Sequence, residues 1–195
     1  MRSSACLIAR SRTIPASFAI RPALPDDLPA VQAIYAHHVL HGLGSFEEAP
    51  PDLAEIRRRY EEVSGRGLPY LVASAGGVVH GFGYCNVFRP RSAYRFSLED
   101  SVYVRETSQR KGVGGLLLAA MIERGAELGY RQMIAVIGDS ANAGSIGLHA
   151  RLGFNRVGTM RSTGFKFGRW VDTVTMQRPL GAGDGTLPEK GSNPR

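Results

Sequence analysis

Cysteine is scarce in this sequence, and neither cysteine lies in a pattern that binds a metal. The 195 residues include two cysteines, Cys6 and Cys85, which lie far apart. This usage fits a reducing compartment, so we expect a cytoplasmic protein without a disulfide scaffold or a cysteine zinc site. His37 and His41 share a helix face, but no glutamate follows His37, as the zinc-protease pattern requires. The sequence therefore predicts no bound metal.

Long apolar runs are also absent. No run approaches the roughly 20 residues that a membrane-spanning helix needs, so we expect no membrane contact. The chain is 43% hydrophobic and 21% charged, which is typical of an ordinary soluble domain with one buried core.

The two ends differ in composition from the rest of the chain. Residues 1–17 contain three arginines and no acid, but they lack the apolar segment of a secretory signal. We expect a disordered or irregular basic leader there, with a transit peptide as the alternative. Residues 181–195 are polar and rich in glycine and proline, which favours a disordered tail. The folded domain should therefore cover residues 18–180.

Acidic residues are outnumbered, since 17 of them face 24 basic ones, for a formal net charge of +7. Such a surplus suits nucleic acid or a small anionic ligand, and charge alone does not choose between them. Because the chain has no recognisable helix-turn-helix or aromatic-basic RNA motif, we expect no nucleic-acid partner.

Hydrophobic periodicity and turn residues predict a mixed α/β arrangement of the α+β type. Strands are expected at residues 18–23, 69–74, 78–88, 93–104, 132–138, 154–160 and 169–177. Helices are expected after Asp26 or Asp27, after Asp52, and over residues 113–128 and 143–152. This order predicts a mostly antiparallel sheet with helices packed on both faces.

The stretch "RETSQRKGVGG", residues 105–115, lies between an expected strand and an expected apolar helix. Its three glycines allow the backbone to approach a ligand, and the first N–H groups of the helix are unpaired. Gln109, Arg110 and Lys111 add donors and charge, which favours a bound pyrophosphate. The alternative is a solvated basic loop that starts a helix. The spacing fits neither a Walker loop nor a dinucleotide fingerprint.

The string "Q-x-x-G-x-G" after "SVYV" resembles the coenzyme A loop of the GNAT N-acetyltransferase superfamily. The likeness extends over roughly residues 19–178, including "GFGYCNVFRPRSAYRFSLEDSVYV", "AVIGDSANAGSIGLHARLGF" and "GFKFGRWVDTVTMQ". These segments resemble the phosphinothricin N-acetyltransferase-like family, which includes enzymes that acetylate methionine sulfone and methionine sulfoximine. The resemblance implies the GNAT fold, acetyl-CoA as cosubstrate, and a homodimer.

Glu99 is the candidate general base. Strand alternation places it opposite Leu98, and an acid beside apolar residues tends to have a raised pKa, which suits deprotonation of an ammonium group. The resemblance places it at the catalytic glutamate of the family. A solvent-facing acid, or one paired with Arg95 or Arg105, is the alternative. Asp100 stands where relatives often carry serine, threonine or histidine, which leaves open how the base is supported.

The resemblance also assigns a binding segment for acetyl-CoA. The backbone of Val102–Val104 would bind the pantetheine arm and the thioester carbonyl, and Gln109–Gly115 would hold the pyrophosphate. Asn142 would contact the pantetheine; a helix cap is its alternative. The full set is Val102, Tyr103, Val104, Gln109, Arg110, Lys111, Gly112, Val113, Gly114, Gly115 and Asn142.

His149 lies where many acetyltransferases have a tyrosine that protonates the departing thiolate. We expect it to act as general acid or to orient the thiolate, with solvent as the other source of the proton and a packed or surface histidine as the alternative.

The acceptor-binding segment of the family resembles "FRPRSAY". Arg89 and Arg91, with Tyr94, would bind the carboxylate or phosphinate of a small amino acid, and a solvated basic turn is the alternative. By the same resemblance, Phe46, Lys166 and Trp170 would line the acceptor pocket, although aromatic residues there can equally belong to the core.

The sequence therefore predicts an acetyl-CoA-dependent N-acetyltransferase that acts on the α-amino group of a small amino acid or analogue. Neither cysteine lies in a nucleophile-like context, which favours direct transfer without an acyl-enzyme. The alternatives are acetylation of a protein N-terminus or another amine, and a non-catalytic protein that binds coenzyme A or nucleic acid.

Overall fold

A seven-stranded sheet organises the chain in this computed structural model, which describes residues 18–188 and residue 194. The strands are β1 (Ala19–Pro22), β2 (Tyr70–Ala75), β3 (Val78–Val87), β4 (Ser97–Val104), β5 (Gln132–Gly138), β6 (Asn155–Lys166) and β7 (Arg169–Pro179). Their order in the sheet is β1-β2-β3-β4-β5-β7-β6, and every neighbouring pair is antiparallel except β4 with β5. The predicted mixed, mostly antiparallel sheet is confirmed.

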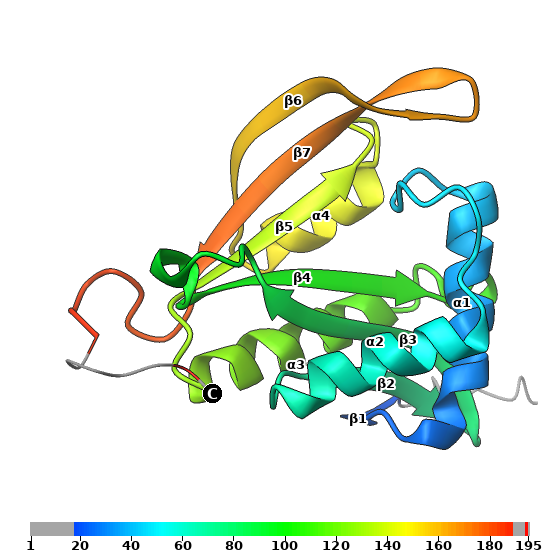
Figure 1. Cartoon of the computed structure of the whole chain (residues 1–195), viewed down its shortest axis with the longest axis horizontal. Coiled ribbons are helices and arrows are strands. Elements are labelled where there is room, and N and C mark those ends of the chain that lie inside the picture. Colours follow the sequence, from blue (N-terminus) through cyan, green and yellow to red (C-terminus); the bar gives the residue numbers. More distant parts are fainter. Residues whose placement is uncertain (1–17, 189–193, 195) are drawn as a thin grey trace, which may run out of the picture.

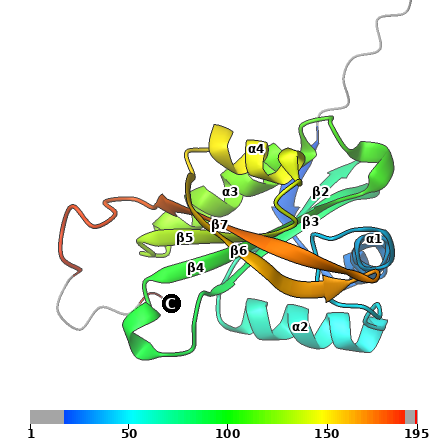
Figure 2. The same cartoon turned by 90° about the horizontal axis from the view of Figure 1, so that it is seen from above.

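Helices cover both faces of this sheet, as predicted (Figure 2). They are α1 (Leu28–His41), α2 (Leu53–Gly65), α3 (Val113–Glu127) and α4 (Ala143–Arg151). Helices α1 and α2 lie on one face, and α3 and α4 lie on the other. The apolar stripe of α3 is fully buried against the sheet at Leu117, Leu118 and Met121, which accounts for the helical spacing of its apolar residues.

The sheet opens between its two central strands (Figure 1). Strands β4 and β5 pair only from Ser97 with Gln132 to Asp100 with Ala135. Beyond that point the rest of β4 pairs with β3 alone, and the rest of β5 pairs with β7 alone. Val136 is consequently 40% exposed within a strand that the sequence predicts as continuously buried. The separation leaves backbone groups on both strands without a strand partner.

Strands β4 and β6 begin or end at different residues than the sequence predicts. Strand β4 begins at Ser97, because Ser92–Tyr94 form a 3₁₀ turn that Arg95 N closes on Ser92 O. Strand β6 continues to Lys166, beyond the predicted end at 160, because it pairs with β7 up to the tip of the hairpin. Register shifts on either side of Gly158 interrupt the alternation from which a strand is recognised.

Asp27 does not cap α1 with its side chain, although the sequence allows it to do so. Its carboxylate instead accepts hydrogen bonds from Arg21, at 2.6 and 2.8 Å, and from the backbone N–H of Leu24. The first turn of the helix is entered through a 3₁₀ turn at Pro25–Asp27. Asp52 does cap α2, accepting from Glu55 N at 2.8 Å.

The predicted leader at residues 1–17 lies outside the described residues. After β7, residues 181–186 form turns and bends, where Arg131 donates to Gly183 O and Thr186 Oγ1. Residues 189–193 and 195 of the predicted tail also lie outside the described residues. Among the residues that the structure describes, no helix is long and apolar enough to cross a membrane. Within the same residues, no three histidine, cysteine, aspartate or glutamate side chains gather in a way that could hold a metal.

Candidate active site

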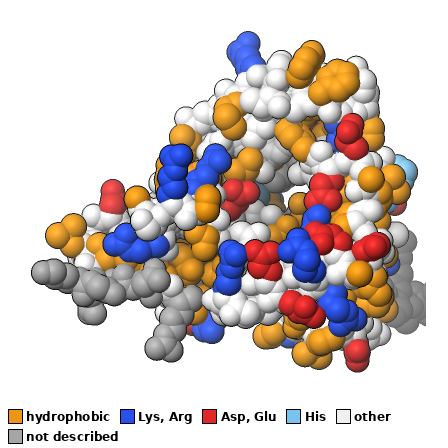
Figure 3. Space-filling view, viewed as in Figure 1, with side chains coloured by type: hydrophobic (Ala, Val, Ile, Leu, Met, Phe, Trp, Pro, Cys, Tyr) orange, Lys and Arg blue, Asp and Glu red, His pale blue; other side chains and the backbone are white. Residues whose placement is uncertain are grey.

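Two cavities lie on the two sides of β4. A groove of about 1120 Å³ follows the opening between β4 and β5, and α3, α4 and the loop after α1 complete its walls. A smaller cavity of about 350 Å³ lies between α1, α2 and strands β2 to β4. In the space-filling view, this side of the molecule is hollowed between the part that carries β6 and β7 and the part that carries α2 (Figure 3).

The glycine-rich loop forms one end of the groove. Gly112 has a φ of 86° and Arg110 a φ of 60°, both in the left-handed region. Helix α3 then starts without a side-chain cap, and its first hydrogen bond runs from Leu116 N to Gly112 O. The preceding N–H groups have no partner within the helix, which is the arrangement that binds anions. Of residues 109–115, all except Lys111 line the groove.

The backbone of β4 forms one wall of the groove. Arg105 N donates to His80 O, so alternate residues from Arg105 backwards bond to β3. Val102 and Val104 therefore direct their backbone groups toward β5, which has moved away at this level. Val102, Tyr103 and Val104 line the same groove as the loop.

His38 of α1 is a groove residue that the sequence reasoning missed. Its Nε2–H donates to the backbone carbonyl of Val104 at 2.9 Å, at the outer end of β4. Burial lowers the pKa of His38, although the bond to the carbonyl opposes the shift, so the ring stays neutral at pH 7. The two residues are 66 positions apart, and no local pattern links them.

His149 of α4 lies deep in the groove and pairs with Asp100 of β4. His149 Nε2 is 3.0 Å from Asp100 Oδ2, and His149 Nδ1 donates to Ser145 O at 2.8 Å. Burial opposes a charge on the ring, but the hydrogen bond and the charge of Asp100 outweigh it, so the pKa of His149 is raised. The sequence selected His149 but did not predict its partner; it left open how Glu99 is supported, and the structure pairs Asp100 with His149.

Asn142 occupies the position that both of its predicted roles require. Its Oδ1 accepts from Ser145 N at 3.1 Å, so the side chain caps α4. The residue also lines the groove. Because Asn142 lies at the N-terminus of α4 and lines the groove, its position is compatible with both a helix cap and a contact to a ligand.

Glu99 faces the smaller cavity on the other side of β4. Burial raises the pKa of its carboxyl, the neighbouring charge of Asp100 raises it further, and Arg89 partly offsets both. A half-buried carboxylate with a raised pKa in a cavity is suited to accept a proton from an ammonium group.

The cavity beside Glu99 is built mostly from residues that the sequence reasoning did not select. Aromatic and polar side chains from α1, α2, β2 and β3 line it, among them Tyr35, Arg59, Tyr70, Phe82, Tyr84 and Asn86. Tyr70 and Phe82 each stack against Tyr84, so stacked aromatic rings form part of the cavity lining. Such residues occur throughout hydrophobic cores, so their type alone does not mark a site.

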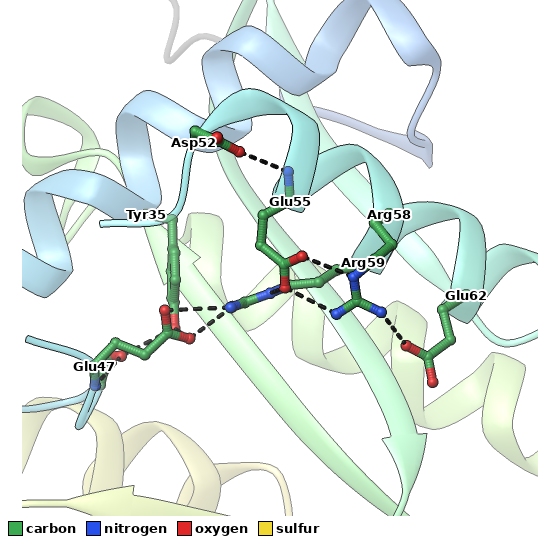
Figure 4. Close-up of polar contacts among 8 residues, drawn as sticks. Tyr35, Glu47, Asp52, Glu55, Arg58, Arg59 and Glu62 are labelled. Carbon is green, nitrogen blue, oxygen red and sulfur yellow. Dashed lines mark hydrogen bonds and ion pairs between the residues drawn. The ribbon is translucent and has the colours of Figure 1, made fainter. Parts of the chain in front are cut away.

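Arg59 is held in the cavity wall by two carboxylates (Figure 4). Its Nη1 donates to Glu47 Oε1 at 2.6 Å, and its Nε donates to Glu55 Oε1 at 2.7 Å. Tyr35 OH donates to the same oxygen of Glu47 at 2.9 Å, and burial above all raises the pKa of Tyr35 to about 12. The positive charge of Arg59 is therefore already compensated within the protein.

Arg89, Arg91 and Tyr94 lie on the exposed connection between β3 and β4, and none of them lines the cavity. Arg89 is nevertheless close enough to lower the pKa of Glu99. Its guanidinium lies over the ring of Phe88, 5.0 Å from the centroid. Within the part of the chain that the structure describes, neither arginine forms an ion pair.

Lys166, Phe46 and Trp170 do not line the cavity either. Lys166 is 1% exposed, and its Nζ donates to the backbone carbonyls of Gly42 and Ser45 at 3.0 and 2.8 Å. It therefore anchors the loop between α1 and α2 to β6. Phe46 of that loop packs against Gly164, and Trp170 is 66% exposed on the β6–β7 hairpin.

The open parallel pair, the uncapped glycine-rich start of α3 and the carboxylate in β4 are the features expected of an acyl-CoA N-acyltransferase. The chain matches the family described as "Acetyltransferase (GNAT) domain" over residues 20–175. It belongs to that family.

Similar proteins of known type support the same assignment. The chain is 56% identical to a phosphinothricin N-acetyltransferase of Alcaligenes faecalis, over 87% of this chain and 86% of that protein. It is 44% identical to an L-methionine sulfoximine/L-methionine sulfone acetyltransferase of Pseudomonas aeruginosa, over 84% and 95%. A solved structure, a GNAT superfamily phosphinothricin acetyltransferase from Sinorhizobium meliloti in complex with AcCoA, matches with a TM-score of 0.88 and 46% identity, covering 91% of this chain and 96% of that chain.

Proposed function

We propose that this protein transfers the acetyl group of acetyl-CoA to the α-amino group of a small amino acid or analogue, of the phosphinothricin or methionine sulfone and sulfoximine type. The observation that carries this proposal is the placement of Glu99 and the coenzyme A groove on the two sides of β4. The similarity to acetyltransferases that act on such amino acids supports the acceptor class.

The groove offers groups that suit the parts of acetyl-CoA. Gly112–Gly115 and Gln109 present backbone and side-chain donors for the pyrophosphate, with Arg110 beside them. The backbone groups of Val102 and the N–H of Val104, which β5 does not pair, lie alongside for the amide groups of the pantetheine arm. Acetyl-CoA supplies a thioester carbonyl that an amine can attack.

The first two steps of the transfer each have a group of this chain beside them. Glu99, directly or through water, takes a proton from the ammonium group of the acceptor. The backbone N–H of Val102 donates to the oxygen on which negative charge develops. The departing sulfur takes its proton from solvent, because Ser145 O and Asp100 Oδ2 engage both ring nitrogens of His149. Cys85 is fully buried, and burial raises its pKa well above the usual range, so it does not serve as a nucleophile.

The charges near Glu99 favour an acceptor that carries a carboxylate. Arg59 is compensated by Glu47 and Glu55, whereas Arg89 is not engaged by any acid among the described residues. Arg89 and Arg91 are therefore the cations that remain to bind an anionic group of the acceptor. A polyamine would be repelled at the same place.

We also propose that two copies of the chain pair and that the protein acts in the cytoplasm. The resemblance to the phosphinothricin N-acetyltransferase-like family supports a homodimer. Large apolar side chains are exposed on the β6–β7 hairpin at Val157, Phe165 and Trp170, and an interface between copies would cover them. The mass in solution, measured by light scattering, tests the homodimer.

The proposed cytoplasmic location is supported by the free, buried thiol of Cys85, which is compatible with a reducing compartment.

The experiment that tests the proposed function is thiol release from acetyl-CoA across a panel of acceptors. The panel contains phosphinothricin, methionine sulfone, methionine sulfoximine, ordinary amino acids, spermidine and a peptide with a free N-terminus. Turnover on one or more zwitterionic amino acids is expected. Turnover on the peptide or spermidine alone would replace the acceptor class, and binding of acetyl-CoA without turnover would remove the enzymatic proposal.

A further inference from the structure

Asp100 carries a buried carboxylate oxygen that no group within residues 18–188 satisfies. Its side chain is 2% exposed, and Oδ2 is engaged by His149. Oδ1 has no hydrogen-bond partner among the described residues. An unpaired acceptor on a buried, charged group is costly, so such atoms usually serve a ligand or a water molecule.

The geometry of His149 fixes the state of this carboxylate. Ser145 O can only accept, so His149 Nδ1 carries a hydrogen. His149 Nε2 faces Asp100 Oδ2, and one proton lies between these two atoms. Whether that proton is closer to nitrogen or to oxygen, Oδ1 remains an acceptor. The pair can therefore accept a hydrogen bond at Asp100 Oδ1, but it has no free hydrogen to donate.

Asp100 lies at the deep end of the groove. It is the last residue of β4 that pairs with β5 before the two strands separate. Moving outward along β4, Val102 and Val104 come next, and the glycine-rich loop follows. A ligand whose phosphates lie at that loop and whose arm follows β4 therefore brings its far end toward Asp100. In coenzyme A, that end carries the thiol and the neighbouring amide.

We propose that Asp100 is a binding residue for the thiol end of coenzyme A, through a hydrogen bond that its free Oδ1 accepts from that end. The donor is either the S–H of free coenzyme A or the amide N–H next to the sulfur. His149 acts as a positioning residue, because its Nε2 holds Oδ2 and so directs Oδ1. The inference rests on the proposed function, since it takes the ligand of the groove to be coenzyme A.

The other groups around the pair do not supply this hydrogen. Cys85 of β3 is the register partner of Asp100, but it forms no hydrogen bond with the carboxylate. Glu99 follows the opposite face of β4. The donor therefore has to come from what enters the groove.

The test is a binding titration by calorimetry that combines variants with truncated ligands. The proteins are the wild type, Asp100→Ala, which removes the acceptor, and Asp100→Asn, which keeps an acceptor without the charge. The ligands are coenzyme A, acetyl-CoA, and the adenosine bisphosphate fragment of coenzyme A, which lacks the arm. Glu99→Gln is the matched control, because it removes the adjacent carboxylate on the other side of β4.

Asp100→Ala is expected to weaken coenzyme A binding roughly tenfold, with Asp100→Asn in between, while the bisphosphate fragment binds all proteins within about twofold. If acetyl-CoA weakens equally, the donor is the amide, and if only coenzyme A weakens, the donor is the thiol. Unchanged binding of both, or an equal loss for the fragment, would overturn the proposal. A wild type that binds no coenzyme A would instead remove the proposed function.

Discussion

Glu99 and Asp100 are consecutive residues of β4, and they serve cavities on opposite sides of the sheet. Strand alternation alone produces this division, because successive side chains point to opposite faces. One carboxylate thus faces the proposed acceptor and the other faces the thiol end of the proposed cosubstrate. The backbone of the same strand lies between them, where the acetyl group would pass.

Replacing Glu99 by glutamine removes the proposed base and leaves the shape of the cavity. Turnover is expected to fall by about 10²- to 10⁴-fold, the usual range for a general base. The affinity for acetyl-CoA should be retained, because Glu99 does not line the groove. Steady-state rates and a binding titration measure the two quantities separately. Unchanged turnover would show that another group takes the proton.

In the pH profile of kcat/KM, the rise at low pH (the acidic limb) reports the pKa of Glu99 in the free enzyme. Burial raises this pKa, so the limb is expected above the ordinary glutamate value of about 4.3. Arg89 lowers the pKa of Glu99, and Arg89→Ala should therefore move the limb to higher pH and raise KM for an amino acid acceptor. Arg91→Ala is the matched control for the limb. If Arg89→Ala leaves both the limb and KM in place, Arg89 does not act at the site.

Lys166→Met tests the anchor of the loop between α1 and α2. Methionine keeps the unbranched apolar stem but lacks the ammonium group, so the carbonyls of Gly42 and Ser45 lose their donor. We expect a loss of about 1–3 kcal/mol in the free energy of unfolding and a higher KM for the acceptor, with KM for acetyl-CoA little changed.

The comparison for that prediction is Lys111→Met. Lys111 does not line the groove, but its positive charge lies in the exposed loop that would hold the phosphates. Its variant should therefore raise KM for acetyl-CoA through lost electrostatic attraction and leave the free energy of unfolding within about 0.5 kcal/mol. The same change in both variants would mean that Lys166 does not serve the acceptor side.

Gly138→Ala probes the contact between the end of β5 and the same loop. A Cβ at Gly138 would overlap the carbonyl oxygen of Leu43, which is backbone and has to move. The free energy of unfolding is expected to fall by about 1–3 kcal/mol, measured by denaturant titration. Gly44→Ala is the control, because nothing lies within 4 Å of its added Cβ. Equal stability of the two variants would contradict the packing described for the loop.

The pairing of His149 with Asp100 predicts how stability depends on pH. The pKa of His149 is raised in the folded protein, so the folded state binds this proton more tightly than the unfolded state. The contribution is fully present below the unfolded value of about 6.5 and is lost as pH rises through the folded value. Asp100→Asn should therefore destabilise most below pH 6.5, as measured by thermal unfolding, and should lower the pKa of His149 by NMR titration. An unshifted His149 would contradict the pairing.

The sequence predicted the fold well, for a physical reason. Helices α1, α2 and α3 each bury apolar residues at helical spacing, and the turns between strands contain glycine at positions such as Gly76 and Gly77, where φ is positive. Strand β6 was predicted too short because its irregular register removes the alternation. The opening of the sheet at Asp100 depends on pairing between strands and leaves no local pattern in the sequence.

The two cavities differ in how far the sequence predicted them. The groove depends largely on one segment, from β4 to the start of α3, whose order along the chain is its order in space. The cavity beside Glu99 combines residues of five elements, and Arg59 lies in "RRRYEE", which reads as a solvated helix face. Lys166 was expected at the acceptor, but its ammonium group is buried on backbone carbonyls, a contact between residues 121 and 124 positions apart.

The crystal structure of Glu99→Gln with acetyl-CoA and the best acceptor of the panel tests the central claim most directly. The account predicts the thioester between β4 and β5, with its carbonyl oxygen at Val102 N–H, and the acceptor nitrogen on the side of residue 99. An acceptor bound on the α4 side of β4, or acetyl-CoA bound outside the groove, would contradict the account.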